Sequence, residues 1–339
     1  MTRISLAAAT QWITALAQDP SPGLAKRVAL RAGCSVSAAR QLIRQLTDCG
    51  WLQRSGPICR PLYQPGLMRQ IVQRYPLVGL DEDRPWAKDF APYFNLTPTV
   101  REMMQHAFTE LLNNAIDHSE GTQVTLSMRQ TASHVQLLVS DDGRGLFDKI
   151  REGFAIDDPG AAMLELSKGR LTSSPARHTG RGLFFTSRLA DVFDLHANAV
   201  AFQHRDWDPS HWVRGKAMRQ AGSAIYMAIA LDTERTLDEV LRSASLDGAS
   251  YGIERTRLPL RLMTSEHVSL ESRAQARRVA SRLGNFREAE LDFSGVERIG
   301  QGFADELFRV FGRDQTSMQL VVRNASQKVA AMIATVQAG

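Results

Sequence analysis

The most regular pattern of apolar and polar positions in the chain runs through residues 104–118. On a helical wheel of about 100° per residue, one apolar stripe contains Met104, Phe108, Leu111 and Ala115. A second stripe, about 110° round the wheel from the first, contains Glu110, Asn114 and Asp117. The pattern predicts a core helix that carries two carboxylates and an amide beside its buried face, which is typical of a polar pocket wall.

The residues after this helix predict two neighbouring strands that share one buried face. Apolar residues alternate at Val124, Leu126 and Met128, and again at Val135, Leu137 and Val139, with a turn at 130–133 between them. Asp141 continues the second alternation, so its carboxylate is expected to point inward, where an unpaired charge is costly. Gly143 and Gly145 then break the strand, as glycines do where backbone must pass close to another group.

A second glycine-rich turn, Thr179-Gly180-Arg181-Gly182, precedes a predicted helix whose apolar positions include Phe185, Leu189 and Val192. A helix start of this kind offers free N–H groups and the positive end of the helix dipole. The turn therefore favours a phosphate group at this place.

These three motifs, E-x-x-x-N-x-x-D, D-x-G-x-G and G-x-G at a helix start, occur in an order that resembles the GHKL ATP-binding fold. DNA gyrase, the heat-shock chaperone ATPase, MutL-type mismatch repair proteins and histidine kinases share that fold. The motifs cover about a quarter of the chain. Taken singly, they are compatible with a solvated helix face and an ordinary turn, and their combination is what favours an ATP site.

The resemblance implies a role for each matching position. Asp141 would accept the adenine amino group, and Asn114 would hold the Mg²⁺ that bridges the phosphates. Glu110 stands where the hydrolytic members keep their general base. Asp117 would line the adenine side. The expected ATP-binding residues are Asn113, Asn114, Asp117, Asp141, Gly143, Gly145, Thr179, Gly180, Arg181, Gly182 and Leu183.

The segment between Gly145 and Gly180 is then expected to be a long, mobile ATP lid. Lys168, Arg170 and Arg181 are its candidate cations for the terminal phosphates. For Lys168 and Arg170, solvated loop charges are an equally good interpretation.

The N-terminal 65 residues predict three helices, at 4–17, 24–31 and 37–49, with Ser35 as a cap before the third. The following Gly50-Trp51-Leu52-Gln53-Arg54-Ser55-Gly56 resembles the strand and wing of a winged helix-turn-helix, as found in many bacterial transcription regulators. This segment holds eight basic and two acidic residues, so it carries a charge of +6 in a chain whose net charge is +5. The asymmetry points to an anionic partner.

The resemblance implies that the third helix would present Ser37, Arg40, Gln41 and Arg44 to a major groove, with Arg54 near phosphate. Duplex DNA is therefore a candidate partner. Winged helices also serve as dimerisation or peptide-docking modules, and arginines are common on solvated faces, so both alternatives stay open.

From Leu258 onward, strand and helix patterns alternate three times, which predicts a small α/β layer domain. Residues 291–296 and 299–308 resemble a STAS-like domain, and the whole layout resembles a family of bacterial proteins that join a GHKL ATPase to such a module. Two features of related signalling proteins are missing. The turn that carries a phosphorylated serine in anti-sigma antagonists reads Gly300-Gln301-Gly302 here, and no histidine precedes His106. Histidine autokinase activity is therefore not expected.

Length and composition set the remaining limits. The 339 residues, 43% of them apolar, suffice for several packed domains. Cys34, Cys49 and Cys59 lack metal-ligand spacing and are read as reduced thiols of a cytoplasmic protein. No apolar run approaches the ~20 residues of a membrane span. The fold class is multidomain α/β and α+β. Its expected parts are a winged helix-turn-helix (1–65), a connector (66–95), a GHKL α/β sandwich or Bergerat fold (96–232), a linker (233–254) and a STAS-like domain (255–339).

The sequence thus predicts a cytoplasmic regulatory protein that binds ATP and Mg²⁺ and hydrolyses ATP with Glu110 as the base. Two alternatives belong to other classes: an anti-sigma-type serine/threonine protein kinase, and a transcription regulator that uses ATP only as a ligand. The STAS-like module is expected to bind a protein partner, and a homodimer is compatible with this layout.

Overall fold

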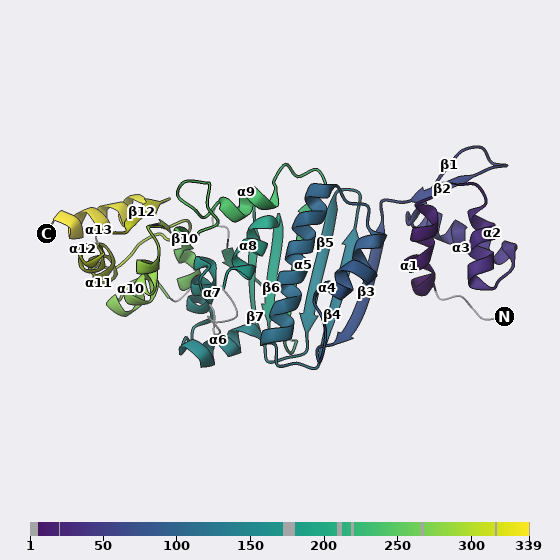
Figure 1. Cartoon of the computed structure of the whole chain (residues 1–339). Helices are drawn as coiled ribbons and strands as arrows, with labels where there is room; N and C mark the ends of the chain where they lie inside the picture. Colours follow the sequence, from purple (N-terminus) through teal and green to yellow (C-terminus); the bar gives the residue numbers. More distant parts are fainter. Residues whose placement is uncertain are drawn as a thin grey trace.

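The computed structural model describes residues 6–19, 21–171, 180–208, 212–217, 220–265, 268–315 and 317–338. Three units follow one another along the molecule in chain order, so the described N- and C-terminal segments lie at opposite ends (Figure 1). We call them the N-terminal unit (6–65), the central unit (69–230) and the C-terminal unit (255–338).

The N-terminal unit consists of three helices and an antiparallel hairpin. The elements are α1 (Leu6–Ala17), α2 (Leu24–Ala32), α3 (Val36–Asp48), β1 (Leu52–Ser55) and β2 (Leu62–Pro65). The side chain of Ser35 accepts a hydrogen bond from the backbone N–H of Ala38, which confirms the predicted cap of α3. The buried indole N–H of Trp51 donates to Thr14 Oγ1 over 2.8 Å and so ties the hairpin to α1.

The central unit is built on a seven-stranded antiparallel sheet in the order β3-β4-β5-β9-β6-β7-β8. The strands are β3 (Arg69–Pro76), β4 (Gln123–Gln130), β5 (His134–Asp141), β6 (Val192–Ala197), β7 (Val200–Arg205), β8 (Trp212–Arg214) and β9 (Ser223–Ala230). The alternating apolar residues of β4 and β5 are buried, which confirms the two predicted strands and their shared inner face.

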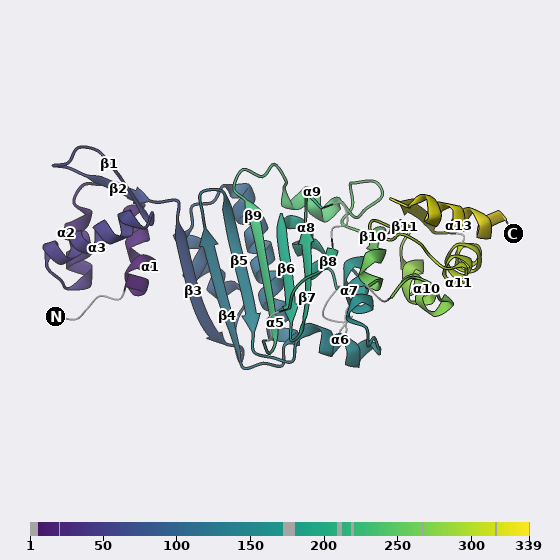
Figure 2. The same cartoon turned by 180° about the vertical axis from the view of Figure 1, so that it is seen from behind.

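Helices cover one face of this sheet, and the view from behind shows the strands in front of them (Figure 2). The main helix is α5 (Pro98–His118), with Thr97 as its cap and Pro98 in its first turn, as predicted. Its stripe of Met104, Phe108, Leu111 and Ala115 is buried against the sheet. The shorter helices of this layer are α8 (Gly182–Leu189) and α9 (Leu237–Arg242), both of which contact α5.

The expected connector at 66–95 is more ordered than its prolines suggest. Strand β3 pairs with β4 over its full length, and the helical pieces α4 (Asp83–Pro85), η1 (Trp86–Phe90) and η2 (Ala91–Tyr93) follow it. The rings of Trp86 and Phe90 lie 5.4 and 5.1 Å from that of Phe108. Because its apolar residues reach this core, most of the segment belongs to the central unit.

The expected lid also differs from a loop. Its first part folds into α6 (Leu146–Phe154) and α7 (Pro159–Lys168), and residues 172–179 lie outside the described part of the chain. The side chain of Asp158 caps α7 by accepting hydrogen bonds from the N–H groups of Gly160 and Ala161. A capped helix therefore stands where a mobile lid segment was expected.

The C-terminal unit is a parallel three-stranded sheet with helices, as the alternation predicted. Its strands, in the order β10-β11-β12, are β10 (Arg255–Pro259), β11 (Glu288–Asp292) and β12 (Gln319–Arg323). The helical elements are η3 (Leu260–Met263), α10 (Arg273–Ala280), η4 (Leu283–Asn285), α11 (Gln301–Ala304), η5 (Asp305–Phe311), α12 (Gly312–Asp314) and α13 (Gln327–Ala338). Helix α7 packs on β10 and η3 and joins this unit to the central one.

Two further expectations can be compared with the fold. Cys34, Cys49 and Cys59 are all free of disulfides. Within the described segments, no helix is both long and apolar enough to cross a membrane.

Candidate functional site

A cavity of about 300 Å³ lies between α5, the turn after β5 and the start of α8. This volume is at the lower end of the range of small-molecule sites, roughly 300–1,000 Å³. Nine residues that the sequence assigned to the ATP site line it: Glu110, Asn113, Asn114, Asp141, Gly145, Gly180, Arg181, Gly182 and Leu183. Three stretches separated by up to about 70 residues are thus brought to one place.

The carboxylate of Asp141 lies at the end of β5 in this cavity. Its Oδ1 accepts hydrogen bonds from the backbone N–H groups of Gly143 and Ser223, over 3.0 and 3.1 Å. In the described part of the chain, nothing hydrogen-bonds Oδ2, which leaves an acceptor available to a ligand. Burial raises the pKa of the Asp141 carboxyl, and the two N–H donors oppose that rise.

The two glycines after Asp141 each allow the backbone to pass close to a different neighbouring residue. A Cβ on Gly143 would lie 2.1 Å from the carbonyl oxygen of Ser119, at the end of α5. Gly145 has φ of 87°, and a Cβ there would lie 2.6 Å from Nδ2 of Asn198. Gly145 lines the cavity, whereas Gly143 packs against α5 and is not among the lining residues. Gly143 thus allows the turn to pack closely against the end of α5, and Gly145 leaves room for a ligand in the cavity.

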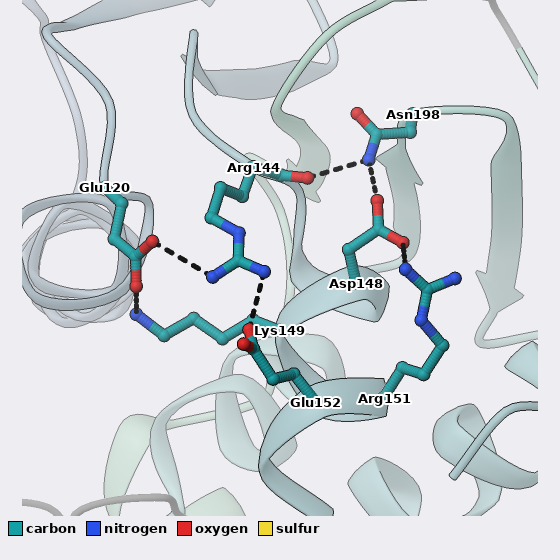
Figure 3. Close-up of polar contacts among 7 residues, drawn as sticks. All are labelled: Glu120, Arg144, Asp148, Lys149, Arg151, Glu152 and Asn198. Atoms are coloured by element: carbon teal, nitrogen blue, oxygen red, sulfur yellow. Dashed lines mark hydrogen bonds and ion pairs between the residues drawn. The ribbon is translucent and has the colours of Figure 1, made fainter. Parts of the chain in front are cut away.

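Polar side chains hold this turn from outside, as Figure 3 shows. Glu120 binds Lys149 Nζ at 2.9 Å and Arg144 Nη1 at 3.2 Å. Hydrogen bonds from Lys149 and then Arg144 lower the pKa of the Glu120 carboxyl. Asn198 donates to the carbonyl oxygen of Arg144 over 2.7 Å and to the Asp148 carboxylate. Exposed pairs of this kind add little stability, so their effect is to orient the turn and Lys149.

The carboxylate of Glu110 lies directly against the start of α8. A Cβ on Gly182 would be only 2.0 Å from Glu110 Oε2, so no other residue type fits at position 182 without movement. The N-terminus of a helix is the end that attracts negative charge. The candidate base therefore lies beside the helix end to which the sequence assigns phosphate.

Leu171 and Gly180 lie close together near this helix start. Gly180 has φ of 69°, and a Cβ on it would lie 2.5 Å from the carbonyl oxygen of Leu171. Leu171 and Gly180 both line the cavity. The predicted site residue Thr179 lies outside the described residues.

Two of the three expected phosphate cations bind the C-terminal unit instead. Lys168 is 2% exposed, and its Nζ contacts Glu165 Oε1 at 2.5 Å and the carbonyl oxygen of Ser281 at 2.6 Å. Arg170 donates to the carbonyl oxygen of Ile253, and its guanidinium lies 5.0 Å from the centre of the Phe286 ring. For Lys168 neither expected role fits, because its charge is buried in the contact between α7 and the C-terminal unit. Arg170 is exposed, as a solvated charge would be, and it is not among the residues that line the cavity.

Arg181 does line the cavity, and it also donates to the carbonyl oxygen of Tyr251 over 3.0 Å. Lys149 is a second lining cation, which the sequence analysis missed. Its only signal was a basic residue one turn into the helix that follows Gly145.

Asp117 is exposed and is not among the residues that line the cavity, which corrects its expected place on the adenine side. His118 and Ser119 line the cavity there instead. The reason is the helical wheel: Asp117 and His118 lie about 60° and 40° from Asn114 in opposite directions. The cavity wall follows the His118 side at the end of α5.

Ser223 is a further site residue that the sequence motifs did not identify. Its N–H reaches Asp141, and its Oγ accepts a hydrogen bond from the N–H of Leu146 over 3.0 Å. Ser223 lies 82 residues after Asp141, and only the pairing of β5 with β9 brings the two together. No local sequence signal could have predicted this contact.

The side chains that line this cavity determine whether Mg²⁺ fits it. Across the described residues, no group of three or more His, Cys, Asp or Glu could hold a metal ion without help. The amide of Asn114 lines the same cavity as the lid residues Gly180 and Gly182. Mg²⁺ commonly binds through one or two protein oxygens together with substrate phosphates and water. The residues present therefore fit a Mg²⁺ that arrives with a nucleotide and do not form a free-standing metal site.

The residues assigned to DNA contact all lie on the surface of the N-terminal unit. Ser37, Arg40, Gln41 and Arg44 project from α3 and are exposed, and Arg54 is exposed on β1. They are therefore accessible to a partner.

Comparison with known protein families agrees with this arrangement for two parts of the chain. No curated protein was found to match. Residues 275–330 match the model of a STAS-like domain of unknown function. Residues 80–202, which include α5, the Asp141 turn and α8, match the model of the histidine kinase-like ATPase domain.

Proposed function

We propose that the protein is a regulator that binds ATP with Mg²⁺ in the cavity of the central unit and hydrolyses it as a switch. The observation that carries this proposal is the convergence of Asp141, Asn114, Glu110 and Gly182 on one cavity. The match to a histidine kinase-like ATPase domain supports the nucleotide as its ligand.

The cavity has two chemically different ends. Apolar side chains from the sheet and α6 surround the end with Asp141, among them Val139, Leu146, Ile150 and Ile225. A flat base fits there, with its amino group donating to Asp141 Oδ2. The other end holds the start of α8 with Gly182 and the cation Arg181. Helix N–H groups and a cation favour a triphosphate there.

Hydrolysis would use Glu110. Its carboxylate lies at the start of α8, where it could take a proton from a water molecule as that water attacks the terminal phosphorus. The bond from this phosphorus to the bridging oxygen then breaks, and ADP leaves. Asn114 would hold Mg²⁺, which supplies neutralisation of phosphate charge when it is bound.

Transfer of the terminal phosphate to a protein serine or threonine is the main alternative for the same site. The histidine kinase-like match fits either outcome, because hydrolysis and transfer differ only in the group that attacks phosphorus. We favour hydrolysis because the turn at Gly300-Gln301-Gly302 of the C-terminal unit carries no acceptor hydroxyl.

A second proposed function belongs to the N-terminal unit, which we interpret as a winged helix that binds duplex DNA. The supporting observation is the exposed polar row of α3, which carries Arg40 and Arg44 in a unit of strongly positive charge. ATP in the central unit would then regulate DNA binding. A regulator in which ATP acts only as a ligand is the limiting case of this proposal.

Binding of the base is tested by Asp141→Asn, which exchanges one carboxylate oxygen for an amide. A charge-assisted hydrogen bond of about 1.5–3 kcal/mol is lost, so ATP affinity should fall about 10- to 100-fold in calorimetry. Asp232→Asn is the matched control, since Asp232 is exposed after β9. Equal ATP affinity of Asp141→Asn and wild type would refute the assigned adenine contact.

The fate of the terminal phosphate is tested by Glu110→Gln, which keeps the size of the side chain and removes its basicity. With γ-labelled ATP and Mg²⁺, free phosphate should appear in wild type and fall about 10²–10⁴-fold in the variant, at nearly unchanged ATP affinity. Unchanged turnover would exclude Glu110 as the base. Label on protein in place of free phosphate would mean a kinase.

DNA binding is tested with the double variant Arg40→Ala/Arg44→Ala in electrophoretic or fluorescence titrations on duplex DNA. Affinity should fall, and the slope of log affinity against log salt should become shallower by about 1 for each lost phosphate contact. Arg298→Ala, at an exposed arginine of the C-terminal unit, is the control. Equal affinity and equal salt slope in the double variant and wild type would favour a protein-docking role for α3.

A further inference from the structure

A second cavity, of about 290 Å³, lies between the central and C-terminal units. The central unit contributes residues of α7, α8 and the β7–β8 region, and the C-terminal unit contributes β10 and Glu290 of β11. It shares no lining residue with the ATP cavity. The charged side chains in its wall are Arg188, Asp206, Arg255, Arg257 and Glu290.

Most of these charges are balanced by ion pairs within the protein. Arg255 lies 2.9 Å from Glu288, and Asp206 lies 3.3 Å from Arg235. Arg257 contacts two carboxylates, at 2.7 Å to Asp292 and 3.4 Å to Glu290. These arginines and carboxylates therefore need no ligand to neutralise their charges.

Arg188 differs from its neighbours. Its guanidinium lies over the ring of Phe184, 3.5 Å from the centroid, and Nη1 donates to the carbonyl oxygen of Phe184 over 3.0 Å. Among the residues that the structure describes, no carboxylate forms an ion pair with it. Burial, followed by the nearby charge of Arg257, lowers the pKa of Arg188 to about 9. The site therefore contains a cation that no carboxylate of the described residues neutralises.

Arg188 is half-buried, and a cation withdrawn from water without a carboxylate partner is costly, so an anion that reaches it reduces this cost. The planar guanidinium of arginine offers paired N–H donors that match the oxygens of a phosphate or a carboxylate. The rest of the wall is suited to a small polar molecule, because the ring of Trp212 and the hydroxyl-bearing Ser167, Ser243 and Thr256 complete it. The volume is near the lower limit for small-molecule sites.

We propose that this interdomain cavity binds a small molecule through an oxyanion, phosphate or carboxylate, held by Arg188. Arg188 also connects this cavity to the ATP cavity, because both cavities are lined by residues of α8. Helix α8 begins at Gly182 in the ATP cavity and carries Arg188 near its other end. A ligand here contacts both units and the helix that ends at the nucleotide site, so it acts on the junction that Lys168 and Arg170 hold together.

The test uses the full chain, dialysed free of phosphate, with inorganic phosphate and succinate as probes at constant ionic strength. Equilibrium dialysis with labelled probe and thermal melting give affinity and stoichiometry for wild type, Arg188→Met, Arg188→Lys and Arg278→Met. Arg278 is an exposed arginine of α10 and serves as the matched control. Phosphate binding alone would identify a phosphorylated ligand class, and succinate binding alone a carboxylate class.

The proposal expects one saturable site per chain for at least one probe. Affinity should fall about tenfold or more in Arg188→Met, fall less in Arg188→Lys, and stay unchanged in Arg278→Met. In probe-free buffer Arg188→Met should melt no lower than wild type, because it removes an uncompensated charge and keeps a side chain of similar length.

Three results would overturn the proposal. The first is that neither probe binds wild type, which would mean that there is no oxyanion site. The second is that binding persists in Arg188→Met, which would place the anion elsewhere, for instance in the ATP cavity. The third is that Arg188→Met melts well below wild type without any probe, which would make Arg188 a structural residue of α8. None of these results bears on ATP binding, which the Asp141 variant tests separately.

Discussion

The arrangement of the central unit depends on the half-buried carboxylate of Asp141. Two backbone N–H groups, one from the turn after β5 and one from the first residue of β9, donate to the same oxygen, and this joins the turn to the start of β9. The same turn can approach α5 only because Gly143 has no side chain. Burial of this carboxylate disfavours its charged form, as its raised pKa reflects, so a ligand that donates to the remaining oxygen recovers free energy.

The lid gives the molecule its second constraint. Lys168 is buried with Glu165 as its partner, and Arg282 reaches the same glutamate over 3.2 Å from the C-terminal unit. Breaking such a pair by removing one partner leaves an uncompensated buried charge, a cost of about 3–5 kcal/mol. Helix α7 therefore cannot move freely over the ATP cavity without disturbing the C-terminal unit. A displacement of α7 would therefore also disturb the contact with the C-terminal unit.

Much of the fold could be predicted from periodicity, because burial of one face imposes a regular pattern. The helix at 104–118 and the strands of Val124 and Val135 lie where alternation placed them, and the caps at Ser35 and Thr97 are present. Strand β3 was missed because prolines flank it. It is also an edge strand, and such a strand can form with only a weak alternation of apolar and polar residues. The lid helices were missed because the whole segment between Gly145 and Gly180 was interpreted as one mobile lid, and the cap at Asp158 was not identified.

The candidate site was predictable to the extent that its residues belong to short motifs. The order of the motifs along the chain was enough to predict that Glu110, Asn114 and Asp141 share one site. Lys168 and Arg170 could not be assigned, since a basic residue in a lid gives no sign of which unit it faces. Ser223 depends on sheet pairing across 82 residues, and a local pattern carries no information about that contact.

The most direct test of the account is hydrogen exchange followed by mass spectrometry, with and without a non-hydrolysable ATP analogue and Mg²⁺. The account predicts slower exchange in peptides covering the end of α5, the turn 141–146 and the start of α8 at Gly182, which form the walls of the cavity. The exchange rates of peptides from β3 and the N-terminal hairpin should stay the same, because these segments do not line the cavity. Absence of protection at both the Asp141 turn and the start of α8, under conditions in which the analogue binds, would contradict the assignment of this cavity to ATP.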